Sequence, residues 1–278
     1  MPNNETYRKD SAMNHSVSVR LVSALAVIVV LCSYFIGCEA FPPNARPSDP
    51  AQPSEPTPSP VQSNGKTIVI DAGHGAPDGG ATGKSTGVIE STLNLKVAYL
   101  LKAELEMLGY NVVMTRTDDN ALAEKKRADM AERLRIMNGS SADMVVSVHM
   151  NEFTDSAVNG PMVFYHKNSP EAQKLAKFVI DGLCDSVGRP RRHANSGNYY
   201  VIRESTPVAI IAECGFLSNP EEEVRLQDAA YQNLLAKGIA AGIQAYFMSL
   251  ASPSPTDMQD LSNPNGTPSV SPNTSPAA

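Results

Sequence analysis

The sequence predicts an α/β domain in which a mostly parallel central sheet of about six strands is covered by helices on both faces. Short apolar runs of strand length alternate with longer segments whose apolar residues recur at helical spacing, a pattern typical of parallel sheets. Both ends of the 278-residue chain have compositions that cannot build a core. The sequence therefore predicts a single folded domain over residues 65–250.

The first predicted strand is 67–70, a β-branched run that is too short for a helix. It is followed by Asp71 and by a glycine turn that contains His74. The other predicted strands are apolar runs of similar length, at residues 110–115, 144–150, 162–165, 199–203 and 208–214.

Helices are predicted between these strands. Residues 93–108 carry leucine and valine at helical spacing and end at Gly109, with Ser91 or Thr92 as the expected N-cap. The other predicted helices are 121–138, 170–187 and a final helical region at 220–250 that contains one or two helices.

The N-terminal segment has the layout of an export signal. Residues 1–20 are polar and carry basic side chains, and an apolar run over 21–38 follows them, so we expect a cytoplasmic N-terminus and then a signal peptide or a signal anchor. Cys38 weakly resembles a lipoprotein processing site. Residues 39–64 and 251–278 are rich in Pro, Ser and Asn, which predicts a disordered linker and a disordered tail. We expect an extracytoplasmic protein that is tethered to the membrane or secreted to the cell wall.

Composition excludes one class of partner. The net charge of −6 argues against nucleic-acid binding, and the absence of Trp weakens any base-stacking site. The four cysteines do not form a disulfide framework, and Cys214 is expected to be a buried core residue.

Three polar residues close apolar strands, at the edge where parallel sheets bind ligands. They are His74, His149 and Glu213, and in the last two strands alternation places His149 with Ser147 and Glu213 with Ile211. Glu90 precedes the 93–108 helix. Each residue alone has a structural explanation, because lone histidines are usually hydrogen-bonded and Glu90 suits a helix N-terminus. Together, two histidines and Glu90 are a ligand set for catalytic zinc, with Glu213 as the general base.

Over residues 67–245 the chain resembles the zinc-dependent N-acetylmuramoyl-L-alanine amidases, which remove stem peptides from bacterial peptidoglycan. The resemblance rests on IVIDAGHGAPDGG at 68–80, Glu90 with LNL at 93–95, VMTR at 113–116, SVHMN at 147–151 and ECGFLSN at 213–219. It implies that His74, Glu90 and His149 are the zinc ligands and that Glu213 is the catalytic glutamate. Ala76 and Met150 depart from the family pattern, which bears on the shape of the pocket.

The resemblance also bears on partners and on the neighbouring residues. It implies peptidoglycan as substrate, a monomer and an optional accessory activator protein. The short stretch after Asn151 leaves no room for the inhibitory helix of some members, so the chain resembles the compact spore-associated and Gram-positive type. The candidates for substrate contacts, or for supports of the metal ligands, are Asp71, Ser147, Asn151 and Arg116. Asp71 could equally cap the turn, and Arg116 could form a structural ion pair. A non-catalytic peptidoglycan-binding module and a zinc hydrolase of another cell-wall bond are the alternatives.

Overall fold

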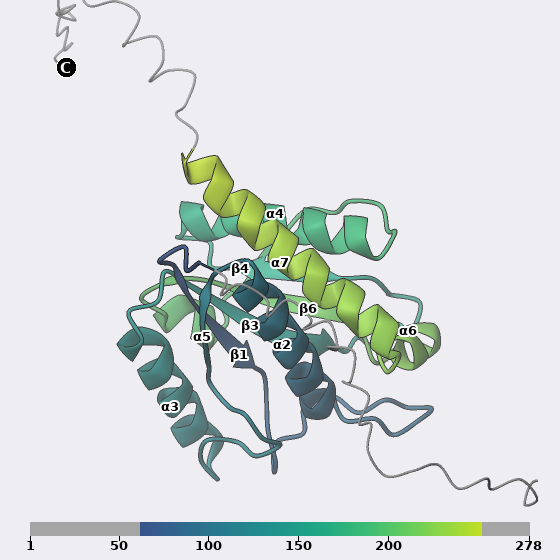
Figure 1. The fold of residues 1–278 in the computed structure, drawn as a ribbon. Coiled ribbons are helices and arrows are strands. Elements are labelled where there is room, and N and C mark those ends of the chain that lie inside the picture. The colour runs from purple at the N-terminus through teal and green to yellow at the C-terminus, as the bar shows by residue number, and fades with distance from the viewer. Residues whose placement is uncertain (1–61, 252–278) are drawn as a thin grey trace, which may run out of the picture. The chain divides into compact units, whose positions relative to one another are not determined.

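Six strands form one sheet in the computed structural model, which describes residues 62–251 (Figure 1). The order across the sheet is β2-β1-β3-β6-β4-β5. Strands β2, β1, β3 and β6 pair in parallel, β4 is antiparallel to β6, and β5 is parallel to β4. The mostly parallel sheet of six strands is confirmed. The bounds are β1 Thr67–Ala72, β2 Asn111–Met114, β3 Met144–Asn151, β4 Met162–Tyr165, β5 Asn195–Ser196 and β6 Val208–Phe216.

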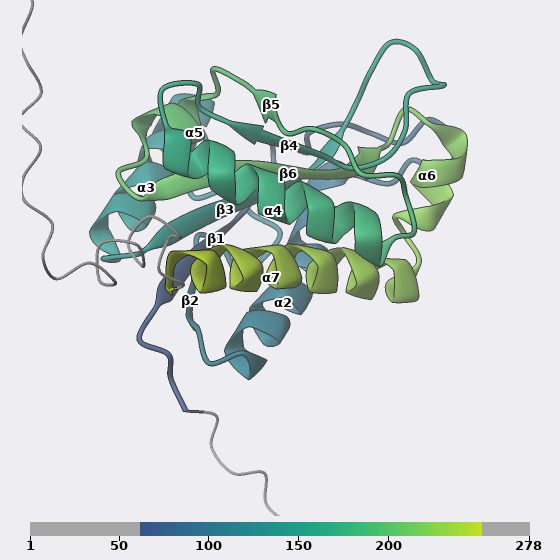
Figure 2. The same cartoon turned by 90° about the horizontal axis from the view of Figure 1, so that it is seen from above.

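Helices cover both faces of this sheet, as predicted (Figure 2). One face carries α2 (Glu90–Met107), α4 (Pro170–Ser186) and α7 (Ala229–Ala251), and the other carries α3 (Lys126–Gly139) and α5 (Tyr200–Glu204). The short helix α6 (Pro220–Arg225) joins β6 to α7. Alternate residues of each central strand enter the two cores, because successive side chains of a strand point to opposite faces. In β1, Ile68 and Ile70 join the larger core, and Val69 joins the smaller one.

Among the helices of residues 62–251, α7 is the one that is long and apolar enough to cross a membrane. Its Leu235, Ile239 and Ile243 are fully buried in the larger core. Since core helices pass the same length and hydropathy test, we interpret α7 as a core helix. Of the one or two helices expected over residues 220–250, the structure has two, α6 and α7.

The predicted strand at 199–203 is wrong. This segment forms helix α5, with Tyr199 as its N-cap residue, and the sixth strand is instead the short β5. Val201 and Ile202 are both buried in the smaller core. A strand would send these adjacent side chains to opposite faces, whereas a helical turn directs both toward the same sheet.

Two helices begin at positions other than those predicted. Helix α2 begins at Glu90 and has Ile89 at its N-cap, so neither Ser91 nor Thr92 is the cap. No side-chain cap is needed, because the backbone N–H groups of Glu90 and Ser91 donate to loop carbonyls at 2.9 and 3.0 Å. Helix α3 begins at Lys126 rather than at 121, because the chain before it folds back and the Leu122 N–H donates to Asp129.

The proposals for residues 1–20, 21–38, most of 39–64 and nearly all of 251–278 lie outside the described residues, as does Cys38. The boundaries of the 65–250 domain therefore stay a prediction.

Candidate active site

The loop that follows β1 holds His74 in an uncommon backbone conformation. His74 has a φ of +60°, in the left-handed region that non-glycine residues rarely adopt. Two buried arginines bind the carbonyls around it: Arg116 donates to Ala72 at 2.8 Å and Gly73 at 3.0 Å, and Arg133 donates to Ala72 at 2.8 Å and also to His74. These contacts stabilise a conformation that is costly for a histidine.

Arg133 also forms a buried ionic network at the end of β1. It is only 1% exposed and contacts Asp71 at 2.7 Å and Asp129, one helical turn earlier, at 2.8 Å. Asp71 also accepts hydrogen bonds from Thr115 at 2.7 Å and Ser147 at 2.6 Å. Burial alone would raise the pKa of Asp71, but the charge of Arg133 and these hydrogen bonds hold it below its usual range.

Arg116 lies at the other side of the loop, where it joins β2, the loop and α2. Besides its two loop contacts it donates to the Ser91 carbonyl in the first turn of α2 at 2.7 Å. It is buried and outside the lining of the pocket described below. Its contacts are those of a support for the loop, rather than those of a residue that touches substrate.

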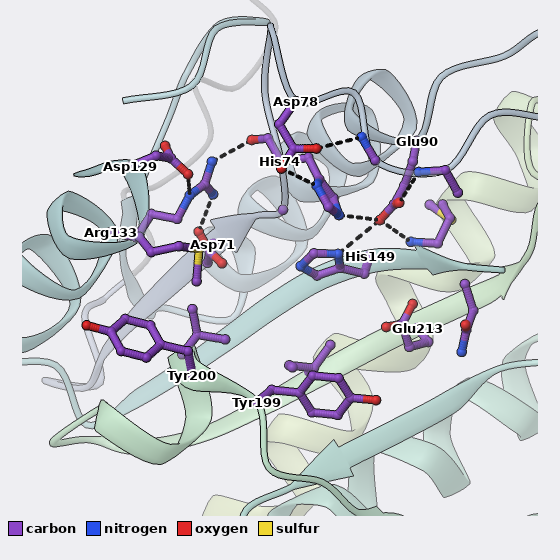
Figure 3. Close-up of a pocket in the computed structure, with 18 of the residues that line it drawn as sticks. Asp71, His74, Asp78, Glu90, Asp129, Arg133, His149, Tyr199, Tyr200 and Glu213 are labelled. Carbon is purple, nitrogen blue, oxygen red and sulfur yellow. Dashed lines mark hydrogen bonds and ion pairs between the residues drawn. The ribbon is translucent and has the colours of Figure 1, made fainter. Parts of the chain in front are cut away.

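Side chains from three separate elements converge beyond this loop (Figure 3). His74 comes from the loop after β1, Glu90 from the start of α2 and His149 from the end of β3. Glu90 Oε1 lies 3.4 Å from His74 Nε2 and 2.9 Å from His149 Nδ1, and the two rings are 5.0 Å apart in an edge-to-face arrangement. One candidate ligand atom from each of the three residues lies within 4.8 Å of the other two, so the group could hold a metal ion.

The surroundings of Glu90 fix its carboxylate. Oε2 accepts the Ala81 N–H at 2.8 Å, and Oε1 accepts the Met150 N–H at 3.2 Å and the Asn94 amide at 3.1 Å. Burial would raise the pKa of Glu90, but the hydrogen bond and charge of His149, with smaller contributions from His74 and Ala81, lower it to about 2. The carboxylate is therefore ionised at neutral pH, as a metal ligand must be.

The geometry also indicates which histidine nitrogens would bind. Asp78 Oδ2 lies 3.2 Å from His74 Nδ1, which leaves His74 Nε2 on the side of Glu90. A carboxylate that fixes the far nitrogen of a histidine ligand is the usual partner of such ligands. In His149 the nitrogen that faces Glu90 is Nδ1.

Two glycines leave room for this group. A Cβ at Gly73 would lie 2.2 Å from the His149 ring, and a Cβ at Gly80 would lie 2.3 Å from Glu90 Oε2. Any side chain at either position would displace one of the three converging residues. Gly73 and Gly80 therefore allow His149 and Glu90 to approach the backbone closely, in addition to allowing the chain to turn.

Glu213 lies beside this group on β6. It pairs in register with His149, although neither residue ends its strand as predicted, because β3 continues to Asn151 and β6 to Phe216. Its Oε2 is buried and has no hydrogen-bond partner among residues 62–251. Burial, with a further contribution from the charge of Glu90, outweighs the effect of His149 and raises the pKa of Glu213 to about 7.

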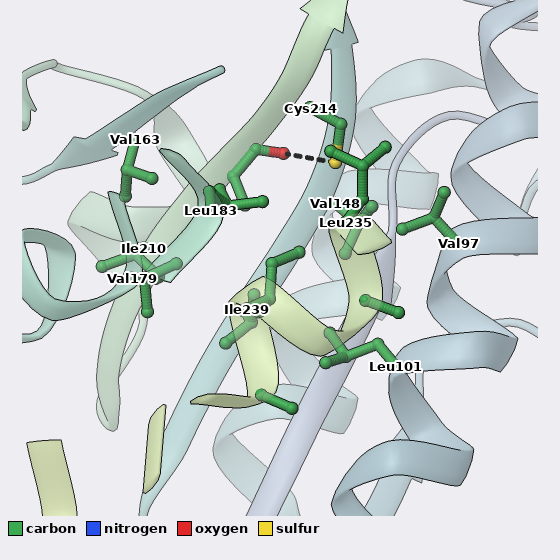
Figure 4. Close-up of a cluster of buried hydrophobic side chains, with 14 of the residues drawn as sticks. Val97, Leu101, Val148, Val163, Val179, Leu183, Ile210, Cys214, Leu235 and Ile239 are labelled. Atoms are coloured by element: carbon green, nitrogen blue, oxygen red, sulfur yellow. Dashed lines mark hydrogen bonds between the residues drawn. The ribbon is translucent and has the colours of Figure 1, made fainter. Parts of the chain in front are cut away.

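Cys214 points the opposite way from Glu213, as predicted. It is fully buried in the larger core with Val148 and Leu235 (Figure 4). Burial, and to a lesser degree the charge of Glu213, raises the pKa of its thiol above the usual value, so it stays protonated. Cys214 is a core residue and not a ligand.

A pocket of about 560 Å³ opens over the converging side chains. Its size is within the range of small-molecule sites. Of the predicted neighbouring residues, Asp71 and Asn151 contribute to the lining, whereas Ser147 is completely buried beneath it. The pocket is also lined by residues that sequence reasoning did not select, namely Asp78, Lys126, Asp129, Met130, Arg133, Tyr199 and Tyr200.

The pocket residues that were not predicted differ in whether a local sequence pattern could have identified them. Asp78 stands inside the motif at 68–80, four residues after His74, and that spacing was a usable signal. Asp129 and Arg133 have the spacing of an ordinary surface ion pair on a helix, so nothing local marks them as buried. The tyrosines lie in the segment that was predicted as a strand.

Comparisons with known proteins agree with this geometry. The family model described as N-acetylmuramoyl-L-alanine amidase matches residues 68–245. The germination-specific N-acetylmuramoyl-L-alanine amidase of Bacillus subtilis is 33% identical over 199 residues, which cover 68% of this chain and 83% of that protein.

Two solved structures are similar to this one. The CwlD amidase of Clostridioides difficile, solved in complex with the GerS lipoprotein, has a TM-score of 0.63 and 33% identity over 66% of this chain and 99% of that chain. The catalytic domain of the amidase CwlV from Bacillus (Paenibacillus) polymyxa has a TM-score of 0.60 and 36% identity over 66% of this chain and 98% of that one.

Proposed function

The chain belongs to the N-acetylmuramoyl-L-alanine amidase family, and we propose that it hydrolyses peptidoglycan with a zinc ion held by His74, Glu90 and His149 and with Glu213 as the general base. The bond is the amide between the lactyl group of N-acetylmuramic acid and the L-alanine of the stem peptide. The observation that carries the proposal is the convergence of these three side chains beside a carboxylate that has an unpaired buried oxygen.

The residues present fit zinc. Two imidazole nitrogens and one carboxylate oxygen are the donors of a catalytic zinc site that keeps one position open. Asp78 and the backbone N–H groups of Ala81 and Met150 hold two of these donors from outside, which is the support that metal ligands normally have. When bound, zinc would supply Lewis-acid chemistry that acidifies a water molecule and polarises the substrate carbonyl.

Glu213 would move the proton in this reaction. Its carboxylate accepts the proton of the attacking water as the water oxygen bonds to the amide carbon, and it then donates that proton to the departing alanine nitrogen. In the metal-free protein, burial raises the pKa of Glu213 to about 7, and a group that titrates near the working pH can serve both transfers. No group among residues 62–251 hydrogen-bonds to Glu213 Oε2 and competes for that proton.

The location and partners form the finer part of the proposal. We propose that the protein acts outside the cytoplasm and that residues 21–38 tether it to the membrane. Support comes from the layout of that segment and from the relatives, among them proteins named as probable cell wall amidases. The germination-specific relative supports a role in spores, and the complex of the CwlD amidase with a lipoprotein supports an accessory protein as partner.

Digestion of purified peptidoglycan tests the proposed reaction. The zinc-loaded protein should release stem peptides whose first residue is alanine with a free amino group, which mass spectrometry detects. Cleavage within the glycan or between the peptides would identify a hydrolase of another bond. Binding of peptidoglycan with no released product would identify a non-catalytic module.

A further inference from the structure

The pocket has two sides of different chemistry around the converging side chains. Asp78 lies on one side of His149 and Tyr199 with Tyr200 on the other (Figure 3). Lys126 belongs to the first side, because its ammonium group lies 3.2 Å from Asp78. One side is therefore charged and the other is aromatic.

The ring of Tyr199 is held in place although it is exposed. It packs edge-to-face on Phe164, with the ring centres 5.2 Å apart, and a Cβ at Gly197 would lie 2.3 Å from it. Nevertheless 43% of the residue is accessible to solvent. A fixed aromatic ring that faces a pocket loses little conformational freedom when a ligand packs on it.

Tyr200 extends this aromatic side. It is 42% exposed, and the Arg203 guanidinium lies 5.6 Å from the centre of its ring. Exposed aromatic residues that adjoin one pocket differ from single exposed residues scattered over a surface, which need no explanation. No hydrogen bond of either tyrosine hydroxyl to another of residues 62–251 is present in the structure, so both hydroxyls are free to bind a polar ligand.

We propose that Tyr199 and Tyr200 bind the sugar ring of the glycan strand, and that the stem peptide lies on the side of Asp78 and Lys126. The inference rests on the proposed amidase function. A pyranose ring combines a face of C–H groups with hydroxyls at its edge, and a tyrosine offers the matching apolar face and polar tip. The stem peptide carries carboxylates, for which the 72%-exposed Lys126 side chain is the suitable partner.

The two products of the reaction allow the two sides to be tested separately. The probes are a peptide-free tetrasaccharide of alternating N-acetylglucosamine and N-acetylmuramic acid, and the free stem tetrapeptide. Each is titrated by NMR into zinc-loaded full-length protein that carries Glu213→Gln. Adding Tyr199→Ala should raise the Kd for the tetrasaccharide about tenfold and leave that for the peptide unchanged.

Two further variants exclude indirect effects. Tyr199→Phe keeps the ring and should retain most of the tetrasaccharide affinity. Tyr99→Ala removes an equally exposed tyrosine, at 42%, from α2 outside the pocket and should change neither Kd.

Equal weakening of both probes by Tyr199→Ala, weakening of the peptide alone, or no change would overturn the inference. Failure of the proposed function is a separate result, because it would appear as wild-type protein that releases no stem peptides. If the wild-type protein releases stem peptides but Tyr199→Ala leaves the Kd for the tetrasaccharide unchanged, only the assignment of the sugar to the tyrosines is contradicted.

Discussion

Two carboxylates on parallel strands that flank β3 have opposite surroundings. Asp71, on β1, contacts Arg133, Thr115 and Ser147, and its pKa lies below the usual value. Glu213, on β6, has a buried oxygen with no partner among residues 62–251, and its pKa rises to about 7. Both strands pair with β3. A satisfied buried charge stabilises structure, whereas an unsatisfied one keeps its capacity to take up a proton.

The largest effect should come from the unsatisfied carboxylate. Glu213→Gln keeps the shape of the side chain and removes its ability to accept a proton, so we expect the rate of stem-peptide release to fall about a thousandfold. Release is measured by mass spectrometry over time. The exposed Glu221→Gln in α6 is the control and should keep wild-type turnover. Near wild-type turnover in Glu213→Gln would remove Glu213 from the role of base.

The satisfied carboxylate should instead matter for folding. Arg133→Met removes a buried cation from between Asp71 and Asp129, and we expect a loss of about 3 to 4 kcal/mol in the free energy of unfolding. Urea denaturation measures it. Arg135→Met on the same helix breaks an exposed ion pair with Glu132 and should cost less than about 1 kcal/mol. Similar losses in the two variants would show that the buried Asp71 network contributes no more to the free energy of unfolding than an exposed ion pair does.

The pH dependence of stability should separate the two carboxylates by sign. The pKa of Glu213 is about 7 in the folded chain and 4.5 without the fold, so its contribution to stability is full below pH 4.5 and is lost as the pH rises through 7. Metal-free Glu213→Gln should therefore be more stable than wild type at pH 8, by roughly 3 kcal/mol.

Asp71→Asn should do the reverse. The pKa of Asp71 is lowered, so its contribution is present above its ordinary pKa of 3.8 and is lost as the pH falls below it. This variant should melt at a lower temperature than wild type at pH 8. If both variants shift the melting temperature in the same direction, the contrast between the two carboxylates is wrong.

The smallest of these effects concerns Asp78, which lies between His74 and Lys126. Asp78→Asn should weaken zinc binding about tenfold, because the amide orients the His74 ring less strongly than a carboxylate does. Competition with a zinc chelator measures the affinity. Asp119→Asn in the nearby loop is the matched control, and an equal loss there would mean that Asp78 has no specific role.

The sequence could select His74, Glu90, His149 and Glu213 as candidates because each stands next to an apolar run or at a helix start, and the structure brings these four side chains together. The sequence also offered Asp71, Ser147 and Arg116 as candidate supports, but it could not predict the buried ion pairs that hold Asp71. Arg133 and Asp129 lie on a helix whose many charges predict a solvated surface, and only the tertiary fold buries them.

Local pattern also failed at α5. The run from Tyr199 to Ile202 has strand-like composition, and its helical form is favoured by packing on the smaller core rather than by its own preferences. The role of Asp71 stayed open in the sequence for a related reason. Its partners Thr115, Arg133 and Ser147 come from the end of β2, from α3 and from β3, Thr115 being the residue after β2, and no short motif contains them.

Zinc stoichiometry tests the central claim most directly. Elemental analysis of the purified protein should find one zinc ion per chain in the wild type and in Glu213→Gln, and almost none in His149→Ala. The first two results follow if Glu213 acts on water without binding the metal, and the third follows if His149 is a ligand. A His149→Ala protein that keeps its zinc, or a Glu213→Gln protein that loses it, would contradict the account.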